Sequence, residues 1–156
     1  IRDAELDVRV VFVGDGPARP KFEKMAQDMG VGDYVNFTGL LSSPLEVRKH
    51  LVDADLMIFP TKGEGLPRTV IESMAVGLPC LSTAVNGIPE LLPNECMFKQ
   101  QDAEAFAQKT IELLNNKDEW TRLSQQAMKK ATEYEEGKLA GRRNNFYLNL
   151  KQLSKV

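Results

Sequence analysis

Short apolar runs separated by helical segments are the feature that most limits how this chain can fold. Residues 8–13 form a largely β-branched, apolar run, which is typical of a strand buried on both faces of a parallel sheet. Shorter runs predict further strands at 35–37, 56–59, 80–82 and 97–98. Because helical segments alternate with these strands, the sequence predicts an α/β fold with a Rossmann-like, doubly wound parallel sheet flanked by helices.

The helical segments carry apolar side chains at spacings of three and four residues. They are expected at 20–29, 44–52, 68–76, 88–92, 103–115, 118–134 and 137–153, so that the last three are C-terminal helices. The first is expected to bury Phe22, Met25, Ala26 and Met29, and the fifth to bury Phe106, Thr110, Leu113 and Leu114. Ser42 or Ser43 can cap the second helix, and Asp102 the fifth. The segment 137–153 has enough apolar residues to need a partner surface.

Composition excludes several classes of protein. With 42% hydrophobic and 27% charged residues, the 156-residue chain fits one globular domain and is neither disordered nor fibrous. A net charge of −2 gives no basic footprint, so we expect no nucleic-acid partner. No apolar run approaches the roughly 20 residues that span a bilayer, and no secretory signal is evident. Cys80 is expected to be a buried, reduced core residue, and no metal-ligand spacing joins the cysteines to His50, so we expect a cytoplasmic protein without a metal site.

Two glutamates eight positions apart, Glu64 and Glu72, lie where a strand is expected to lead into a helix. Gly63 and Gly65 flank the first glutamate, and a glycine-rich turn at a helix start offers backbone N–H groups and a positive dipole end to a phosphate. Carboxylates on either side of that helix start can accept hydrogen bonds from sugar or ribose hydroxyls. The pattern indicates a nucleotide-sugar site, and a plain turn with solvated acids is the alternative.

Two further turns follow predicted strands. The turn at 14–19 resembles a dinucleotide-binding fingerprint only weakly, because Arg19 replaces its third glycine, and a plain strand-to-helix turn is the alternative. Gly87 opens a second turn that is a candidate for the phosphate side of a ligand, and Asn86 before it tolerates left-handed backbone angles. Glu90 is expected to be an acid at a helix start and not a ligand.

Five motifs in order resemble the retaining glycosyltransferases of the GT-B fold, in the family called group 1 or family 4. They are 11–17 (VFVGDGP), 35–39 (VNFTG), 54–61 (ADLMIFPT), 64–72 (EGLPRTVIE) and 87–92 (GIPELL). The resemblance extends from about residue 8 to about residue 114. The family usually has two glycines where this chain has Asn86 and Gly87, and Pro67 is a variant that the family often shows.

The resemblance implies that residues 1–156 form a single nucleotide-sugar-binding domain, most of the C-terminal half of a two-domain enzyme. The first strand and helix of that half and the acceptor domain would lie upstream. Glu64 would be the catalytic acid beside the donor sugar, and Glu72 would hold the ribose. The remaining donor-binding residues would be Gly14, Gly63, Gly65, Leu66, Arg68, Thr69 and Gly87. A surface position for Arg68 is an equal alternative.

The activity implied is transfer of a hexose-type sugar from a nucleoside diphosphate sugar, with retention, to an acceptor glycan, lipid or other glycoconjugate. The resemblance implies no metal and no further cofactor, and peripheral association of the full enzyme with the membrane is common in the family. We expect this chain alone to be inactive, because the basic residues that would help to hold the charge of the leaving group are largely missing from it. The alternatives are a non-catalytic nucleotide-binding or interaction module and, less favoured, a nucleotide-sugar epimerase.

Overall fold

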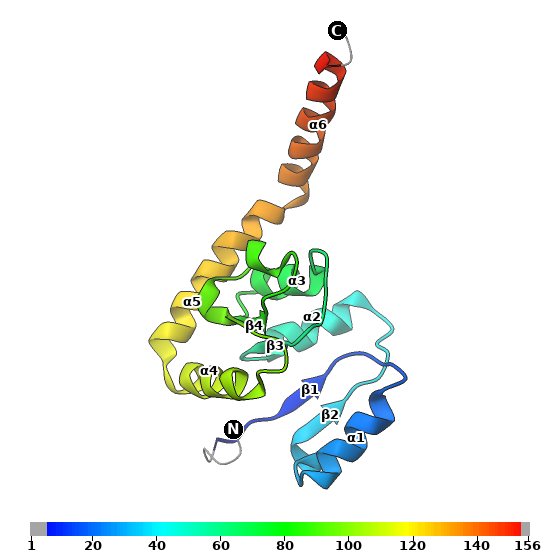
Figure 1. Ribbon diagram of the computed structural model, residues 1–156, viewed down its shortest axis with the longest axis vertical. Coiled ribbons are helices and arrows are strands. Elements are labelled where there is room, and N and C mark those ends of the chain that lie inside the picture. Colours follow the sequence, from blue (N-terminus) through cyan, green and yellow to red (C-terminus); the bar gives the residue numbers. More distant parts are fainter. Residues whose placement is uncertain (1–5, 154–156) are drawn as a thin grey trace.

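The computed structural model describes residues 6–153 and contains two parallel sheets flanked by helices (Figure 1). The described strands are β1 (Val10–Phe12), β2 (Val35–Phe37), β3 (Met57–Phe59), β4 (Cys80–Thr83) and β5 (Met97–Phe98). Strands β1 and β2 pair with each other, and β3, β4 and β5 pair in that order. Every one of these pairings is parallel, as the sequence predicts, although hydrogen bonding divides the expected single sheet in two.

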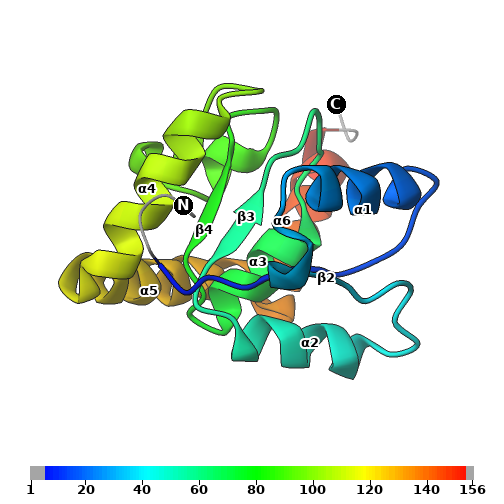
Figure 2. The same cartoon turned by 90° about the horizontal axis from the view of Figure 1, so that it is seen from below.

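The helices begin and end within a few residues of their predicted positions. They are α1 (Arg19–Asp28), α2 (Pro44–Asp53), α3 (Arg68–Ala75), α4 (Ala103–Asn115), α5 (Lys117–Ala131) and α6 (Glu136–Leu153). Short 3₁₀ segments are η2 (Gly32–Tyr34), η3 (Ile88–Glu90), η4 (Asn94–Cys96) and η5 (Thr132–Tyr134), the last of which replaces the predicted final turn of α5. Viewed from below, α4 lies on one side of β3 and β4, and α1 on the other (Figure 2).

Two helix starts confirm the predicted capping chemistry. At α2 the cap is Ser43, whose hydroxyl accepts from the Leu45 N–H at 3.0 Å, while the Glu46 carboxylate accepts from the Ser43 N–H at 3.1 Å. At α4 the Asp102 carboxylate accepts from the Ala105 N–H at 3.1 Å. Each bond satisfies a backbone donor that the first turn of a helix leaves unpaired.

The hydrophobic core is centred on β4, which is buried at every position. Helix α3 packs against it through Val70, Ser73 and Met74, which recur at the helical spacing of three and four. Helix α5 packs on α3 and closes the core with Leu123. The core therefore lies directly beneath the loops that leave β3 and β4.

The predicted burial of β1 on both faces is wrong. Val10, Val11, Phe12 and Val13 are between 40% and 50% exposed. The reason is that β1 has β2 as its only hydrogen-bonded neighbour among the described strands, and a two-stranded sheet offers few side chains to cover either face. For the same reason, the predicted buried face of α1 is wrong. Ala26 is buried, but Phe22, Met25 and Met29 are exposed. In α4, Leu114 is exposed as well, while Phe106, Thr110 and Leu113 are buried as predicted.

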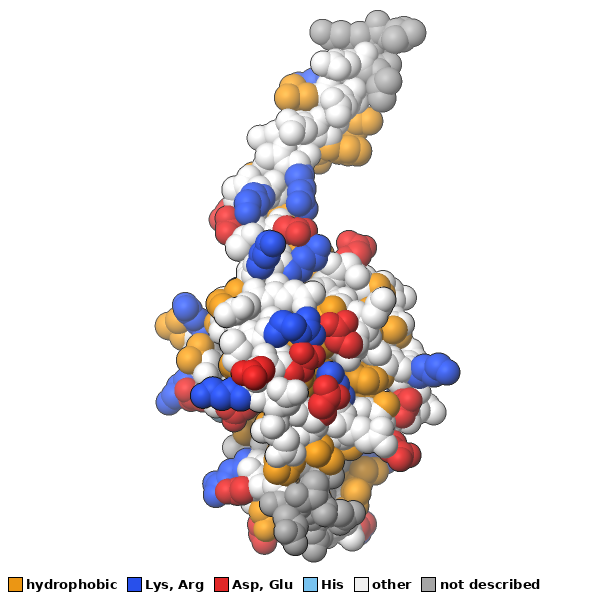
Figure 3. Space-filling model, turned by 90° about the vertical axis from the view of Figure 1, so that its left-hand side faces the viewer, with side chains coloured by type: hydrophobic (Ala, Val, Ile, Leu, Met, Phe, Trp, Pro, Cys, Tyr) orange, Lys and Arg blue, Asp and Glu red, His pale blue; other side chains and the backbone are white. Residues whose placement is uncertain are grey.

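Helix α6 extends away from the body of the molecule (Figure 1). Its apolar side chains are exposed, including Phe146, Tyr147, Leu148 and Leu150, and Figure 3 shows hydrophobic side chains along this projecting helix. The prediction that this segment exposes apolar residues is confirmed. None of the described helices is both long and apolar enough to cross a membrane.

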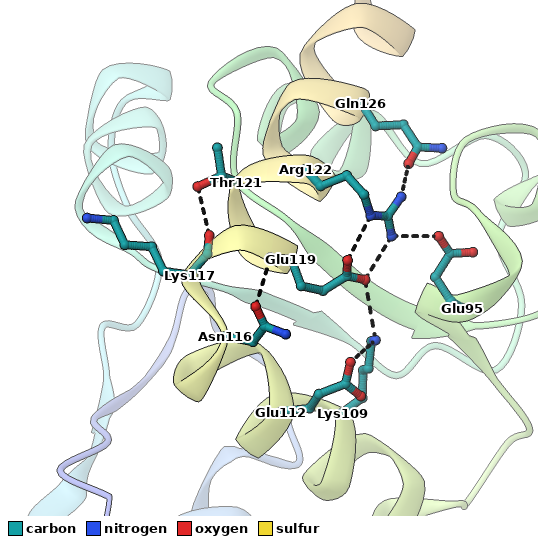
Figure 4. A network of polar contacts seen from close by, with 9 residues as sticks. All are labelled: Glu95, Lys109, Glu112, Asn116, Lys117, Glu119, Thr121, Arg122 and Gln126. Atoms are coloured by element: carbon teal, nitrogen blue, oxygen red, sulfur yellow. Dashed lines mark hydrogen bonds and ion pairs between the residues drawn. The ribbon is translucent and has the colours of Figure 1, made fainter.

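A network of charged side chains joins η4, α4 and α5 (Figure 4). Arg122 donates to Glu119 at 2.7 Å and to Glu95 at 3.0 Å, and Lys109 lies 3.7 Å from Glu119. The hydrogen bond from Arg122 holds the pKa of Glu119 below its ordinary value of 4.5. The network therefore connects the segment before β5 to the two helices that cover it.

Candidate functional site

All the predicted site residues except Gly14 lie in the loops and the helix start that follow β3 and β4. Gly63, Glu64, Gly65 and Leu66 occupy the loop between β3 and α3, and Gly87 follows β4. In open α/β sheets this edge is where ligands bind, because the loops there converge above the strand ends. The sheet topology thus brings together residues, such as Gly65 and Gly87, that are more than twenty positions apart in the sequence.

The two loops meet backbone to backbone. The Gly87 N–H donates to the Gly65 carbonyl oxygen at 3.1 Å. A Cβ atom added at Gly87 would lie 2.1 Å from that oxygen, so that only glycine fits this approach. On the preceding residue, Asn86 has φ = 44°, which confirms that asparagine can adopt the left-handed conformation predicted for this turn. The Gly87 N–H is consequently engaged within the protein.

The start of α3 presents free backbone donors. Pro67 is the residue that precedes α3 and has no N–H of its own. The N–H groups of Leu66, Arg68 and Thr69 have no acceptor within the part of the chain that the structure describes, and the first donor to pair is Ile71, at 3.3 Å from the Pro67 oxygen. Unpaired N–H groups and the positive end of the helix dipole favour an anion such as a phosphate here.

The two acids lie on either side of this helix start. Glu64 is half-buried, and the Thr61 hydroxyl lies 3.5 Å from its carboxylate. Glu72, one turn into α3, is 3.3 Å from the Arg68 guanidinium. The Arg68 side chain is 90% exposed, which places it at the surface, and an exposed pair of this kind contributes at most about 1 kcal/mol to stability. Both carboxylates are therefore accessible to a ligand bound at the N-terminus of α3.

Gly14 is the predicted site residue that the structure does not bring into this cluster. It follows β1, in the other sheet, where its N–H donates to the Thr38 hydroxyl at 3.3 Å and its backbone pairs with Gly39. A Cβ atom at Gly14 would meet nothing within 4 Å. The site thus consists of the β3–α3 loop, the first turns of α3 and the turn after β4.

Three polar side chains that the sequence analysis did not single out support the β3–α3 loop. The hydroxyls of Ser82 and Thr83 donate to the carbonyl oxygens of Phe59 and Thr61, and the Gln100 side chain donates to that of Lys62. Ser82 and Thr83 could have been found from the sequence, because they are hydroxyl residues at the end of an otherwise apolar strand and buried hydroxyls need acceptors. No sequence pattern marks Gln100.

A hollow of about 370 Å³ lies elsewhere, between residues 89–93 and α5. Its floor includes Cys80 and Cys96, and it contains none of the predicted donor-binding residues. Burial raises the pKa of both thiols, that of Cys96 to about 11, so that they stay protonated at neutral pH and are poor nucleophiles. The free donors and the two carboxylates lie instead at the strand ends, which are therefore the candidate site. Among the described residues, no group of three or more His, Cys, Asp or Glu side chains could hold a metal ion.

Parallel strands flanked by helices, with loops that converge at the carboxyl ends of the strands, define a doubly wound α/β protein of the Rossmann-like class. Residues 1–116 match the family model described as glycosyl transferases group 1. The chain therefore belongs to the group 1 glycosyltransferases.

Relatives with known names agree with this family. The chain is 29% identical over 117 residues to N-acetyl-alpha-D-glucosaminyl L-malate synthase of Bacillus anthracis, a match that covers 73% of this chain and 30% of that protein. It is also similar to the sulfoquinovosyl transferase SQD2 of Arabidopsis thaliana, with 26% identity over 141 residues, 86% of this chain and 27% of that protein. The chain thus spans less than a third of the length of these two relatives.

Solved structures show the same fold. The sucrose-phosphate synthase of Thermosynechococcus elongatus matches with a TM-score of 0.81 and 22% identity, over 97% of this chain and 41% of that one. The Anabaena protein Alr3699/HepE in complex with UDP-glucose matches with a TM-score of 0.73 and 17% identity, over 84% of this chain and 39% of that one. The fold expected from the sequence resemblance, that of the GT-B glycosyltransferases, is confirmed.

Proposed function

We propose that this chain is the donor-binding domain of a glycosyltransferase that moves a sugar, with retention, from a nucleoside diphosphate sugar to an acceptor. The observation that carries the proposal is the loop junction at Gly65 and Gly87 beside the unpaired N–H groups at the start of α3. Glu64 and Glu72 flank that junction. This combination offers donors for a diphosphate and acceptors for hydroxyl groups on both sides of it.

Each residue of the site has a role in this proposal. The N–H groups of Leu66, Arg68 and Thr69 donate to the diphosphate, whose charge increases as the donor bond breaks, so that donors fixed in advance stabilise the leaving group. Glu72 accepts hydrogen bonds from the ribose hydroxyls, and charge-assisted bonds of this type are among the stronger ones. Glu64 accepts hydrogen bonds from the donor sugar and is the catalytic residue of the proposal. Gly63 and Gly65 let the backbone approach the ligand closely, and Gly87 lets the loop after β4 approach Gly65.

The HepE structure contains UDP-glucose, which supports a nucleoside diphosphate sugar as the donor here. We propose that residues 1–156 act as one domain and that the acceptor glycan, lipid or other glycoconjugate is bound by residues outside this chain. Transfer by this chain alone is accordingly not expected. The expectation that donor binding needs no metal and no further cofactor remains part of the proposal, as do a cytoplasmic location and peripheral association of the full enzyme with a membrane.

The test is calorimetric titration of this chain with UDP, GDP and ADP. We expect one nucleotide to bind, and Glu72→Ala to weaken it by about tenfold, the equivalent of ~1.4 kcal/mol. Glu104→Ala is the matched control, because Glu104 is an exposed glutamate in the first turn of α4. Absence of binding by all three nucleotides would contradict the proposal and favour an interaction module. Equal nucleotide affinity of the wild type and Glu72→Ala would show that Glu72 does not bind the ribose.

A further inference from the structure

We propose that Thr83 and Gln100 are positioning residues that hold the loop bearing Glu64 in place for the donor sugar. The proposal rests on the function proposed above and extends it to residues that make no contact with the donor themselves. Its basis is a set of hydrogen bonds that reach the β3–α3 loop from two other segments of the chain.

Thr83 acts from β4. Its side chain is buried, with the residue 2% exposed, and its hydroxyl donates to the Thr61 carbonyl oxygen. The neighbouring Ser82, which is fully buried, donates to the Phe59 carbonyl oxygen at 2.8 Å. The end of β4 therefore fixes both the last residue of β3 and the first part of the loop, from inside the core.

Gln100 acts from the segment between β5 and α4. Its side-chain amide donates to the Lys62 carbonyl oxygen at 2.9 Å, across 38 positions of sequence. Two consecutive carbonyl groups of the loop are thus held by two unrelated segments. The far end of the loop is held separately, by the bond from the Gly87 N–H to Gly65. Glu64 lies between these fixed points.

The contacts of Thr61 carry this constraint to the carboxylate of Glu64. The Thr61 hydroxyl lies 3.5 Å from that carboxylate and accepts from the Gly63 N–H at 3.4 Å. Release of the Thr61 and Lys62 carbonyl groups would therefore free Glu64 to move. Glu72 belongs to α3 and has no part in these bonds. We call the bonds from Thr83 and Gln100 to this loop the clamp. The clamp is consequently expected to affect the sugar side of the donor more than the nucleotide side.

The difference between the sugar side and the nucleotide side determines the experiment. For each variant, the affinity for UDP-glucose is compared with the affinity for UDP, and the affinity for GDP-mannose with the affinity for GDP. Thr83→Val is matched by Thr110→Val, since Thr110 is also 2% exposed and its hydroxyl donates to the Phe106 carbonyl oxygen at 2.7 Å in α4. Gln100→Ala is matched by Gln108→Ala, which removes another surface amide bond, to Glu104 at 3.3 Å. Amide hydrogen exchange of residues 61–66 is measured in all variants.

We expect Thr83→Val and Gln100→Ala to weaken the nucleotide sugar by roughly three- to tenfold relative to the nucleotide, the effect of one net hydrogen bond. Both should also speed exchange in residues 61–66, while the two controls change neither quantity and Thr83→Ser restores both. Unchanged exchange would overturn the clamp. Faster exchange with an unchanged affinity ratio would overturn its role in positioning Glu64. A wild-type chain that binds neither ligand would instead contradict the proposed function, while the exchange data would still decide the clamp.

Discussion

Gly87→Ala is the substitution for which the structure gives the clearest expected effect. The backbone of Gly87 has φ = −79° and ψ = −5°, which alanine adopts without strain, so that the cost is steric. The new Cβ would lie 2.1 Å from the Gly65 oxygen and 3.0 Å from the Gly65 carbonyl carbon. An unstrained C···O contact is about 3.3 Å or longer, so the two loops must separate by about 1 Å.

The magnitude follows from three contributions. Overpacking against backbone atoms, which cannot rotate away, costs about 1–3 kcal/mol. The bond from the Gly87 N–H to Gly65, at 3.1 Å, would lengthen and lose about 1 kcal/mol. Alanine restricts the unfolded chain more than glycine does, which returns about 0.4–1 kcal/mol. We therefore expect Gly87→Ala to lower the free energy of unfolding by about 1–3.5 kcal/mol and to weaken nucleotide binding.

Urea unfolding followed by tryptophan fluorescence measures this change. The chain has a single tryptophan, Trp120, whose indole N–H donates to the Asp55 carbonyl oxygen at 2.7 Å and so reports a tertiary contact. Gly63→Ala is the control in the same loop, because its Cβ would meet only the Asn86 amide, at an ordinary 3.8 Å. If Gly87→Ala proves as stable as Gly63→Ala within about 0.5 kcal/mol, the contact between the loops is not rigid and the reasoning fails.

Other predictions concern the core, a helix start, the charged network and metal dependence. Met74→Ala, at a fully buried position, should cost about 2–5 kcal/mol in urea unfolding, and a smaller loss would mean that the core collapses around the cavity. Ser43→Ala should cost about 1 kcal/mol and lower helicity measured by circular dichroism, because it removes the hydroxyl that accepts from the Leu45 N–H at the start of α2. The hydrogen bond from Arg122 lowers the pKa of Glu119, and the pKa of Glu95 is lowered by its own backbone N–H and by Arg122. The two carboxylates therefore contribute their full stabilisation above pH 4.5, and this stabilisation is lost as the pH falls through their lowered pKa values. Acid titrations of the urea midpoint should therefore decline less steeply in Arg122→Met, and parallel curves would refute the role of the network. EDTA should leave the calorimetric affinity for the nucleotide unchanged, and a loss of binding that Mg²⁺ restores would show a metal requirement.

Local signals explain which parts of the fold could be predicted. Helix α2 follows from Ser43, Pro44 and Glu46, because capping depends on residues within one turn. The strand at β4 follows from its apolar run, and its burial agrees with that pattern. The turn at Glu64 between β3 and α3 follows from Gly63 and Gly65, because glycine spacing is a local signal for a turn.

Contacts between distant segments explain what could not be predicted. The exposure of Val10–Phe12 depends on which strands flank β1, and no property of the run itself specifies its neighbours. The bond from Gln100 to Lys62 joins residues 38 positions apart and needs the end of β5 beside the β3–α3 loop. The pair between Arg68 and Glu72 lies at the helical spacing of four residues, which is a signal that the sequence does contain.

The site draws its rigidity from the best-packed part of the molecule. Val70, Met74, Leu81 and Ile88 are fully buried directly beneath the two loops that meet at Gly65 and Gly87. Local opening of a protein begins where few apolar contacts are buried, which here is the sheet of β1 and β2. Such opening would displace Gly14, which is bound to Thr38 and Gly39, without disturbing the bonds that hold Glu64. If Gly14 contributes to donor binding, that contribution should therefore be more sensitive to temperature and denaturant than the contribution of Glu72.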